Sequence, residues 1–139
     1  DADNALFASL DRVTRQEMPA AYDKLAFAKA LESWMGAVYA CNAYIDEAAP
    51  WALRKTDPER MQTVLATLYI SIALLAVAVM PVMPQSMARL LEAMGLGPDL
   101  RTFEGIWSHW YSPLAESGYR IDKPQGLFPR VELPESEPA

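Results

Sequence analysis

Side chains able to do covalent, metal or acid–base chemistry are scarce among the 139 residues of this chain. His109 is the one histidine and Cys41 the one cysteine, and they lie far apart in sequence. A Cys–His dyad needs the two groups within hydrogen-bond reach, so we interpret Cys41 instead as a small core residue. One histidine and one cysteine also fall short of a zinc ligand set. The adjacent carboxylates of Asp46 and Glu47 leave a helix in different directions, which favours a solvated surface over acid–base catalysis.

The sequence has no motif for holding phosphate groups, since neither G-x-x-x-x-G-K-[ST] nor G-x-G-x-x-G occurs. We therefore predict no catalytic residue, no metal site and no bound cofactor in this chain. A single cysteine excludes an intrachain disulfide, and residues 1–11 are acidic and lack the apolar core of a secretory signal. Both features fit a cytoplasmic protein. The abrupt start leads us to expect a domain excised from a longer chain.

Trp51 is the best candidate for contact with a ligand, because the backbone around it is stiff. Pro50 cannot continue the helix that leads into it, and it disfavours the α region for Ala49. Pro50 is also well suited to begin a new short helix, which we expect over residues 50–55. A rigid indole at such a corner either packs between two helices or offers its face to a flat ligand such as a nucleobase. Large aromatic residues are mostly core, so residue chemistry alone favours packing.

Charge gives a mixed signal about a nucleic-acid partner. The formal net charge is −6, whereas nucleic-acid binders usually have a basic surplus. A local exception follows Trp51 directly, where Arg54, Lys55 and Arg60 outnumber the acidic side chains of Asp57 and Glu59.

Two segments together resemble one protein family. Residues 42–51 read N-A-Y-I-D-E-A-A-P-W, which resembles the N-x-Y-[IV]-x-E-x-x-P-W segment of the anticodon-binding domain of methionyl-tRNA synthetases. Residues 118–131 read G-Y-R-I-D-K-P-Q-G-L-F-P-R-V, similar to the G-x-x-[IV]…P-x-x-L-F-P-R-[IV] closing motif of the same family. The resemblance covers about residues 20 to 131, and the two motifs occur in the family's order.

The resemblance implies a C-terminal helical bundle that binds the CAU anticodon of tRNA(Met). In this family the tryptophan of the P-W pair stacks on an anticodon base, which assigns that role to Trp51 and the fixing of its backbone to Pro50. Arg54 and Lys55 are then expected to contact phosphate groups. The family also reads bases with an Asn and an Arg on its first helix. Asn4 and Arg12 lack the expected spacing, and we expect the chain to begin after that helix.

The resemblance also implies a parent enzyme whose chemistry lies elsewhere. Neither an H-x-G-H nor a K-M-S-K-S signature occurs in the chain. Adenylate formation with ATP, magnesium and methionine would belong to a catalytic domain of the same polypeptide, which would be the bundle's protein partner. We expect no DNA partner and no membrane association.

Hydrophobic periodicity predicts an all-α bundle of four or five helices. We expect a first helix over residues 4–18 that ends at Pro19, and a long second helix over residues 21–48. The apolar stripe of the second helix, from Phe27 to Ile45, includes Asn42, whose amide would therefore be buried and hydrogen-bonded. Two further helices, one that begins at Pro84 and one over residues 100–113, are expected to complete the bundle. Residues 1–131 form the predicted domain, and residues 132–139 an acidic, proline-rich tail.

The most apolar stretch begins after Asp57-Pro58-Glu59, a helix-start pattern. Residues 61–88 carry no formal charge, and by length alone they could span a membrane. Polar side chains dilute the first third, and Pro81 and Pro84 break the helix. The other helices also need an apolar partner, so we predict that residues 61–79 form the central core helix.

Two other interpretations stay open at this stage. The bundle could belong to another class I aminoacyl-tRNA synthetase, although the two motifs argue against that. It could also be a helical protein-interaction module without an RNA role, which the acidic charge would suit.

Overall fold

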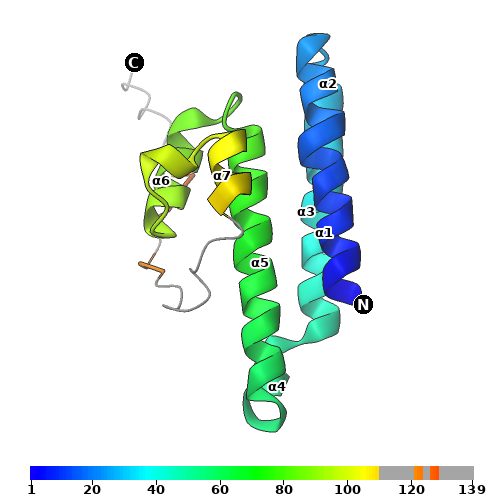
Figure 1. Ribbon diagram of the computed structural model, residues 1–139, viewed down its shortest axis with the longest axis vertical. Coiled ribbons are helices and arrows are strands. Elements are labelled where there is room, and N and C mark those ends of the chain that lie inside the picture. Colours follow the sequence, from blue (N-terminus) through cyan, green and yellow to red (C-terminus); the bar gives the residue numbers. More distant parts are fainter. Residues whose placement is uncertain (110–120, 124–125, 129–139) are drawn as a thin grey trace, which may run out of the picture.

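The computed structural model describes residues 1–109, 121–123 and 126–128, with the side chains of 107–109 excepted. Every regular element in this part of the chain is a helix (Figure 1), which confirms the all-α fold class. The predicted tail, residues 132–139, and the domain boundary at residue 131 lie outside the described residues.

The N-terminal helix is longer than predicted. It runs through α1 (Ala2–Arg12), a π-helical segment η1 (Val13–Glu17) and α2 (Met18–Asp23) without a break. The expected end at Pro19 is therefore wrong. The wider π turn, in which the Met18 N–H donates to the carbonyl oxygen of Val13, lets the proline ring enter the helix without the usual clash. The chain turns instead after Asp23, where Leu25 adopts a left-handed φ of 55°.

Helix α3 (Phe27–Ala48) returns along α1 and α2 and begins later than predicted. Its buried residues are Ala30, Ala37, Cys41 and Tyr44, whereas Phe27 and Asn42 are exposed. The predicted burial of Asn42 is wrong, because α3 packs against α1 on one side and α5 on the other. Ala30 and Ala37 lie in the middle of its buried face, where their small side chains allow the neighbouring helices to approach closely. The larger apolar residues of the predicted stripe lie to one side.

After a short helix α4 (Pro50–Thr56), helix α5 (Pro58–Val79) passes through the middle of the fold. Figure 1 shows α5 between α1 and α3 on one side and α6 and α7 on the other. Twelve of its side chains are buried. Within the described chain it is the one helix long and apolar enough to cross a membrane, yet 67% of that window is buried inside the fold. This burial confirms the predicted central core helix.

The remaining described elements cover the far side of α5. They are α6 (Pro84–Ala93), a 3-10 turn η2 (Pro98–Leu100) and α7 (Phe103–His109). The core accordingly has two clusters that share α5. One cluster joins α1, α3 and α5 around Leu10 and Val64, and the other joins α5, α6 and α7 around Val77 and Leu91.

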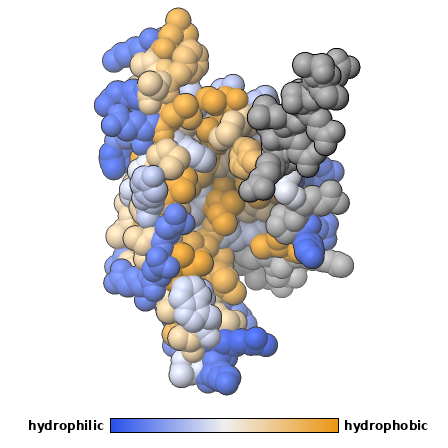
Figure 2. Space-filling view, turned by 180° about the vertical axis from the view of Figure 1, so that it is seen from behind, coloured by the Kyte–Doolittle hydropathy of each residue, from blue (hydrophilic) through white to orange (hydrophobic). Residues whose placement is uncertain are grey.

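Apolar side chains also reach the surface. Figure 2 shows an apolar band along the middle of the back face. Large apolar side chains exposed on α3 and α5 include Met35, Tyr39, Leu65 and Ile72. Exposed apolar area of this kind is typical of a surface that contacts other polypeptide.

Candidate nucleic-acid interface

The corner between α3 and α4 is built by one strained residue and one proline. Ala49 has φ 44° and ψ 60°, in the left-handed region that L-residues rarely adopt. Its N–H donates to the carbonyl oxygen of Ile45 over 2.9 Å, and its own carbonyl oxygen accepts from the N–H of Ala52 over 2.8 Å. Pro50 is buried and forms the first position of α4. The predicted helix break at Pro50 and the new helix after it are both confirmed.

Trp51 projects from this corner with 64% of its surface exposed. The indole that packs between two helices is Trp34, which is half-buried and donates its N–H to the carbonyl oxygen of Leu75. Trp51 is thus mostly exposed in the described fold, and it belongs to neither core cluster. Its backbone is fixed by the residues before it.

Arg54 and Lys55 lie three and four positions after Trp51 on the same helix, so the three side chains share one face of α4. Both cations are exposed, and neither forms an ion pair with another described residue. The structure thus brings together the four predicted site residues, counting Pro50, on a single helix. An exposed aromatic face beside two available cations can stack on a base and contact phosphate groups.

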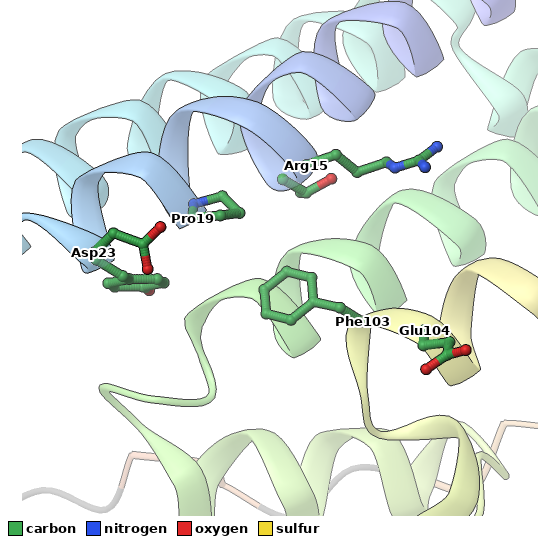
Figure 3. A pocket seen from close by; sticks show the side chains of 7 residues that line it. Arg15, Pro19, Asp23, Phe103 and Glu104 are labelled. Carbon is green, nitrogen blue, oxygen red and sulfur yellow. The ribbon is translucent and has the colours of Figure 1, made fainter.

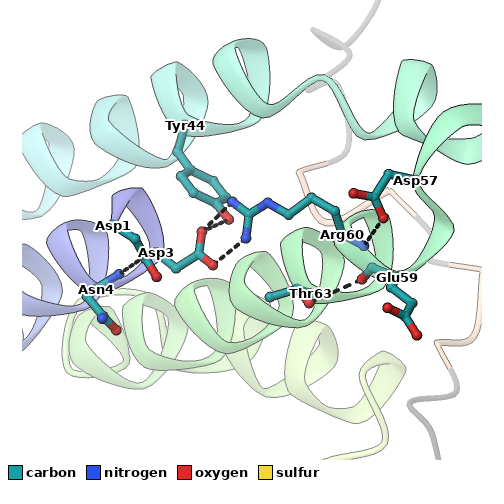
Figure 4. A network of polar contacts seen from close by, with 8 residues as sticks. All are labelled: Asp1, Asp3, Asn4, Tyr44, Asp57, Glu59, Arg60 and Thr63. Carbon is teal, nitrogen blue, oxygen red and sulfur yellow. Dashed lines mark hydrogen bonds and ion pairs between the residues drawn. The ribbon is translucent and has the colours of Figure 1, made fainter.

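A polar network joins α3, which precedes the corner, to α5, which follows α4 (Figure 4). Arg60 of α5 donates two hydrogen bonds to the carboxylate of Asp3 in α1, over 2.5 Å to Oδ2 and 2.7 Å to Oδ1. Tyr44 of α3 donates its hydroxyl to the same Oδ1 over 2.7 Å. The backbone N–H of Arg60 also donates to the carboxylate of Asp57, the N-cap of α5, over 3.0 Å. We call Asp3, Tyr44 and Arg60 the corner clamp.

The corner clamp is charged at neutral pH. The Arg60 guanidinium lowers the pKa of the Asp3 carboxyl from 3.8 to about 2, against the opposing effect of burial. The Asp3 carboxylate in turn raises the pKa of Arg60. Burial and the hydrogen bond to Asp3 raise the pKa of the Tyr44 hydroxyl, which stays protonated and donates. The sequence grouped Arg60 with Arg54 and Lys55 as a basic cluster. In the structure Arg60 is engaged by Asp3 and does not extend the cationic surface of the other two.

Little in the sequence predicts the corner clamp. Its three members lie on three helices, and Asp3 is 41 positions from Tyr44 and 57 from Arg60, so the packing of α1 against α3 and α5 brings them together. One sign was available in retrospect: an acidic residue, Asp3, occupies a position on the apolar stripe that Leu6 and Leu10 continue.

Among the described side chains, the other candidate chemical groups do not gather into a site. Cys41 is buried, and burial raises the pKa of its thiol, which confirms its interpretation as a core residue. The side chain of His109 lies outside the described part. In the part of the chain that is described, no group of three or more His, Cys, Asp or Glu side chains is placed to hold a metal ion.

A pocket of about 650 Å³ opens at the end of the bundle opposite α4, between η1, α2 and α7 (Figure 3). Pro19, Tyr22 and Phe103 supply apolar walls, and Arg15 and Glu104 stand at its edge. The pocket is therefore not part of the interface on α4.

The second sequence motif lies beside α6 where it is described. The backbone N–H of Asp122 donates to the carbonyl oxygen of Ala93 over 2.9 Å, and Arg89 donates to the carbonyl oxygen of Leu127 over 3.3 Å. Leu127 is half-buried and Phe128 is 66% exposed. Pro129 and Arg130 of the motif lie outside the described residues.

A family model described as the anticodon binding domain of methionyl tRNA ligase matches residues 1–137 of the chain. The chain belongs to this family. The anticodon-binding domain of methionyl-tRNA ligases was the family that the two motifs resembled, and the match extends the resemblance over nearly the whole sequence. It decides against the two other interpretations, a bundle from a sister class I synthetase and an unrelated interaction module.

Relatives in two further comparisons are methionyl-tRNA ligases. The enzyme of Brucella suis biovar 1 is 35% identical over 134 residues, which cover 94% of this chain and 24% of the relative. The enzyme of Rhizobium meliloti is 32% identical over 139 residues, which cover 98% of this chain and 26% of the relative. The apo Mycobacterium tuberculosis methionyl-tRNA synthetase superimposes with a TM-score of 0.79 at 28% identity, over 96% of this chain and 27% of that one. The chain thus spans about a quarter of the length of these relatives.

Proposed function

We propose that this domain binds the anticodon of tRNA(Met) through α4, as part of a methionyl-tRNA ligase. The observation that carries the proposal is the indole of Trp51, 64% exposed on a corner whose backbone is fixed by Ala49 and Pro50. Stacking of a base on an aromatic side chain contributes roughly 1–3 kcal/mol. An indole on a fixed backbone keeps most of this stacking free energy, since little side-chain and backbone freedom is lost on binding.

Arg54 and Lys55 extend the interface toward the RNA backbone. They share the face of α4 with Trp51, so a base stacked on the indole places its flanking phosphate groups within their reach. The chain as a whole carries a net charge of −6, which opposes a polyanion. Long-range attraction is therefore weak here, and local contacts at α4 supply the affinity.

The parent polypeptide supplies the chemistry. A Mycobacterium tuberculosis methionyl-tRNA synthetase bound by methionyl-adenylate superimposes with a TM-score of 0.77, and this chain covers 25% of it. We assign ATP, magnesium and methionine to a catalytic domain of the same polypeptide, in a cytoplasmic enzyme whose nucleic-acid partner is tRNA.

The test is Trp51→Ala in the full-length ligase. Loss of one stack should lower kcat/KM for tRNA by roughly 5- to 150-fold, since about 1.4 kcal/mol corresponds to a factor of ten. The kcat/KM of Trp51→Phe should lie between those of the native enzyme and Trp51→Ala, because phenylalanine keeps a smaller aromatic face. Methionine-dependent pyrophosphate exchange should hardly change. Phe27→Ala, which removes an exposed aromatic side chain from the start of α3 at the end of the bundle away from α4, is the matched control.

Normal charging of tRNA by a folded Trp51→Ala enzyme would overturn the proposal. A parallel loss of pyrophosphate exchange would also contradict it, because that result would place the effect of Trp51 in adenylate formation and not in recognition of tRNA.

A further inference from the structure

We infer that Asp3 is a positioning residue, which fixes the direction of Trp51 by clamping the two helices that carry α4. The inference rests on the proposed function for its consequence in RNA binding, although the position of the indole can be measured without RNA. The ion pair between Asp3 and Arg60 is partly buried and lies outside the interface itself.

The corner clamp encloses the segment that carries Trp51. Tyr44 lies on α3 before the corner and Arg60 on the first turn of α5 after it. Both side chains donate to one carboxylate, that of Asp3, with Oδ1 shared between them. The entry to α4 and the exit from it are therefore tied to each other and to α1 (Figure 4).

Helix α4 packs along α5 but buries little of its own surface. It has seven residues, too few for a stable helix on its own. Pro50 is its one buried residue, and Leu53 adds a half-buried contact with the core cluster around Leu10 and Val64. Trp51 itself is exposed and contributes nothing to the core. The direction of the indole is thus set by where α3 ends and where α5 begins.

The corner clamp is suited to hold those ends rigidly. The side chain of Asp3 is 12% exposed and that of Arg60 37%, and the guanidinium engages both carboxylate oxygens. Charge-assisted pairs of this two-point geometry are directional as well as strong. Removing the carboxylate leaves Arg60 and the Tyr44 hydroxyl without their shared acceptor, so α3 and α5 lose their common anchor at this end of the bundle.

Removal of the Asp3 carboxylate lowers the preorganisation of Trp51 and removes no contact with RNA. None of the three clamp residues needs to touch the nucleic acid for its removal to weaken binding. Trp51 would sample more orientations, and ordering it on binding would cost affinity. A merely structural ion pair would instead lower stability and leave the orientation of the folded indole unchanged.

The experiment measures the environment and mobility of the Trp51 indole without RNA. The full-length protein is labelled with 5-fluorotryptophan, and the resonance that disappears in Trp51→Phe is assigned to Trp51. Asp3→Asn and the milder Tyr44→Phe, which keeps the ion pair, should shift or broaden that resonance and leave that of Trp34 unchanged. Tyr22→Phe is the matched control, because it removes a hydroxyl that donates to the carbonyl oxygen of Ala78, on the other side of the bundle.

Binding of an anticodon stem-loop RNA then tests the consequence. Asp3→Asn should weaken it by roughly 3- to 10-fold, in the lower part of the range found for coupled residues. The same substitution should have no further effect in a Trp51→Ala background, because it acts through the indole. Tyr22→Phe should bind normally.

The outcomes separate the inference from the proposed function. An unchanged Trp51 resonance in folded Asp3→Asn and Tyr44→Phe proteins overturns the positioning role, whatever Trp51→Ala does. Equal weakening by Asp3→Asn with and without Trp51 also overturns it. If instead Trp51→Ala binds RNA normally while Asp3→Asn moves the resonance, the proposed function fails and the positioning role stands.

Discussion

Trp34 in α3 donates its indole N–H to the backbone carbonyl oxygen of Leu75 in α5, over 2.9 Å. The bond joins two long helices at the point where both core clusters meet, since Trp34 packs against each of them. A helix that is apolar on every side needs such partners all round. Leu75, with 5% of its surface exposed, therefore lies where a charge has no access to water.

Leu75→Asp should unfold the domain. An unpaired buried carboxylate costs about 3–5 kcal/mol, a large part of the stability of a domain of this size. Leu65→Asp, on the same helix but 48% exposed, should lower the free energy of unfolding by less than about 1 kcal/mol. Urea denaturation followed by circular dichroism measures both. A cooperative, near-normal transition for Leu75→Asp would contradict the central placement of α5.

Features that rest on local chemistry were predictable from the sequence. Pro50 lacks an N–H and restricts the residue before it, so the end of α3 and the start of α4 follow from one residue type. The central helix followed from its uncharged length and from the start signal at Asp57, whose carboxylate caps the N–H of Arg60.

Features that depend on packing were not predictable. The same rule that located the corner at Pro50 failed at Pro19, because a π turn before it accommodates the ring. The turn at Leu25 uses a left-handed leucine, which no sequence rule favours. Asn42 was misplaced because alanines, which carry little hydrophobic signal, mark the closest approach of α3 to its neighbours.

Ala49 should tolerate glycine better than its neighbour does. A left-handed φ costs an L-residue roughly 1–2 kcal/mol, and glycine removes that strain at a smaller entropic cost. We expect Ala49→Gly to raise the free energy of unfolding by about 0.5–1 kcal/mol. Ala48→Gly, one position earlier inside α3, should lower it by about 1 kcal/mol. Opposite signs in paired urea titrations are the expected result, and equal destabilisation by both would rule out strain at Ala49.

Asp3 should make the stability of the domain depend on acid pH. Its pKa is about 2 in the folded state against an ordinary 3.8, so the carboxylate stabilises the fold above the unfolded pKa. That stabilisation, about 2 kcal/mol, is lost as the pH falls from about 4 toward about 2. The difference in unfolding free energy between the native protein and Asp3→Asn should be constant above about pH 5 and shrink below about pH 4. A difference that does not change with pH would mean that the Arg60 pair does not lower the pKa.

Arg54 and Lys55 should govern the salt dependence of RNA binding. A phosphate contact releases a condensed counterion, so the affinity falls with salt by a slope of about 0.7 per contact for single-stranded RNA. Arg54→Ala and Lys55→Ala should each weaken binding of an anticodon stem-loop modestly at low salt and lower the slope of log K against log salt by about 1 at most. Trp51→Ala should weaken binding with the slope unchanged, since stacking releases no counterion. Lys29→Ala is the matched control: it removes the same charge from the start of α3, at the end of the bundle away from α4. A slope lowered as much by Lys29→Ala as by Arg54→Ala would assign the salt dependence to net charge alone, and the phosphate contacts at α4 would be wrong.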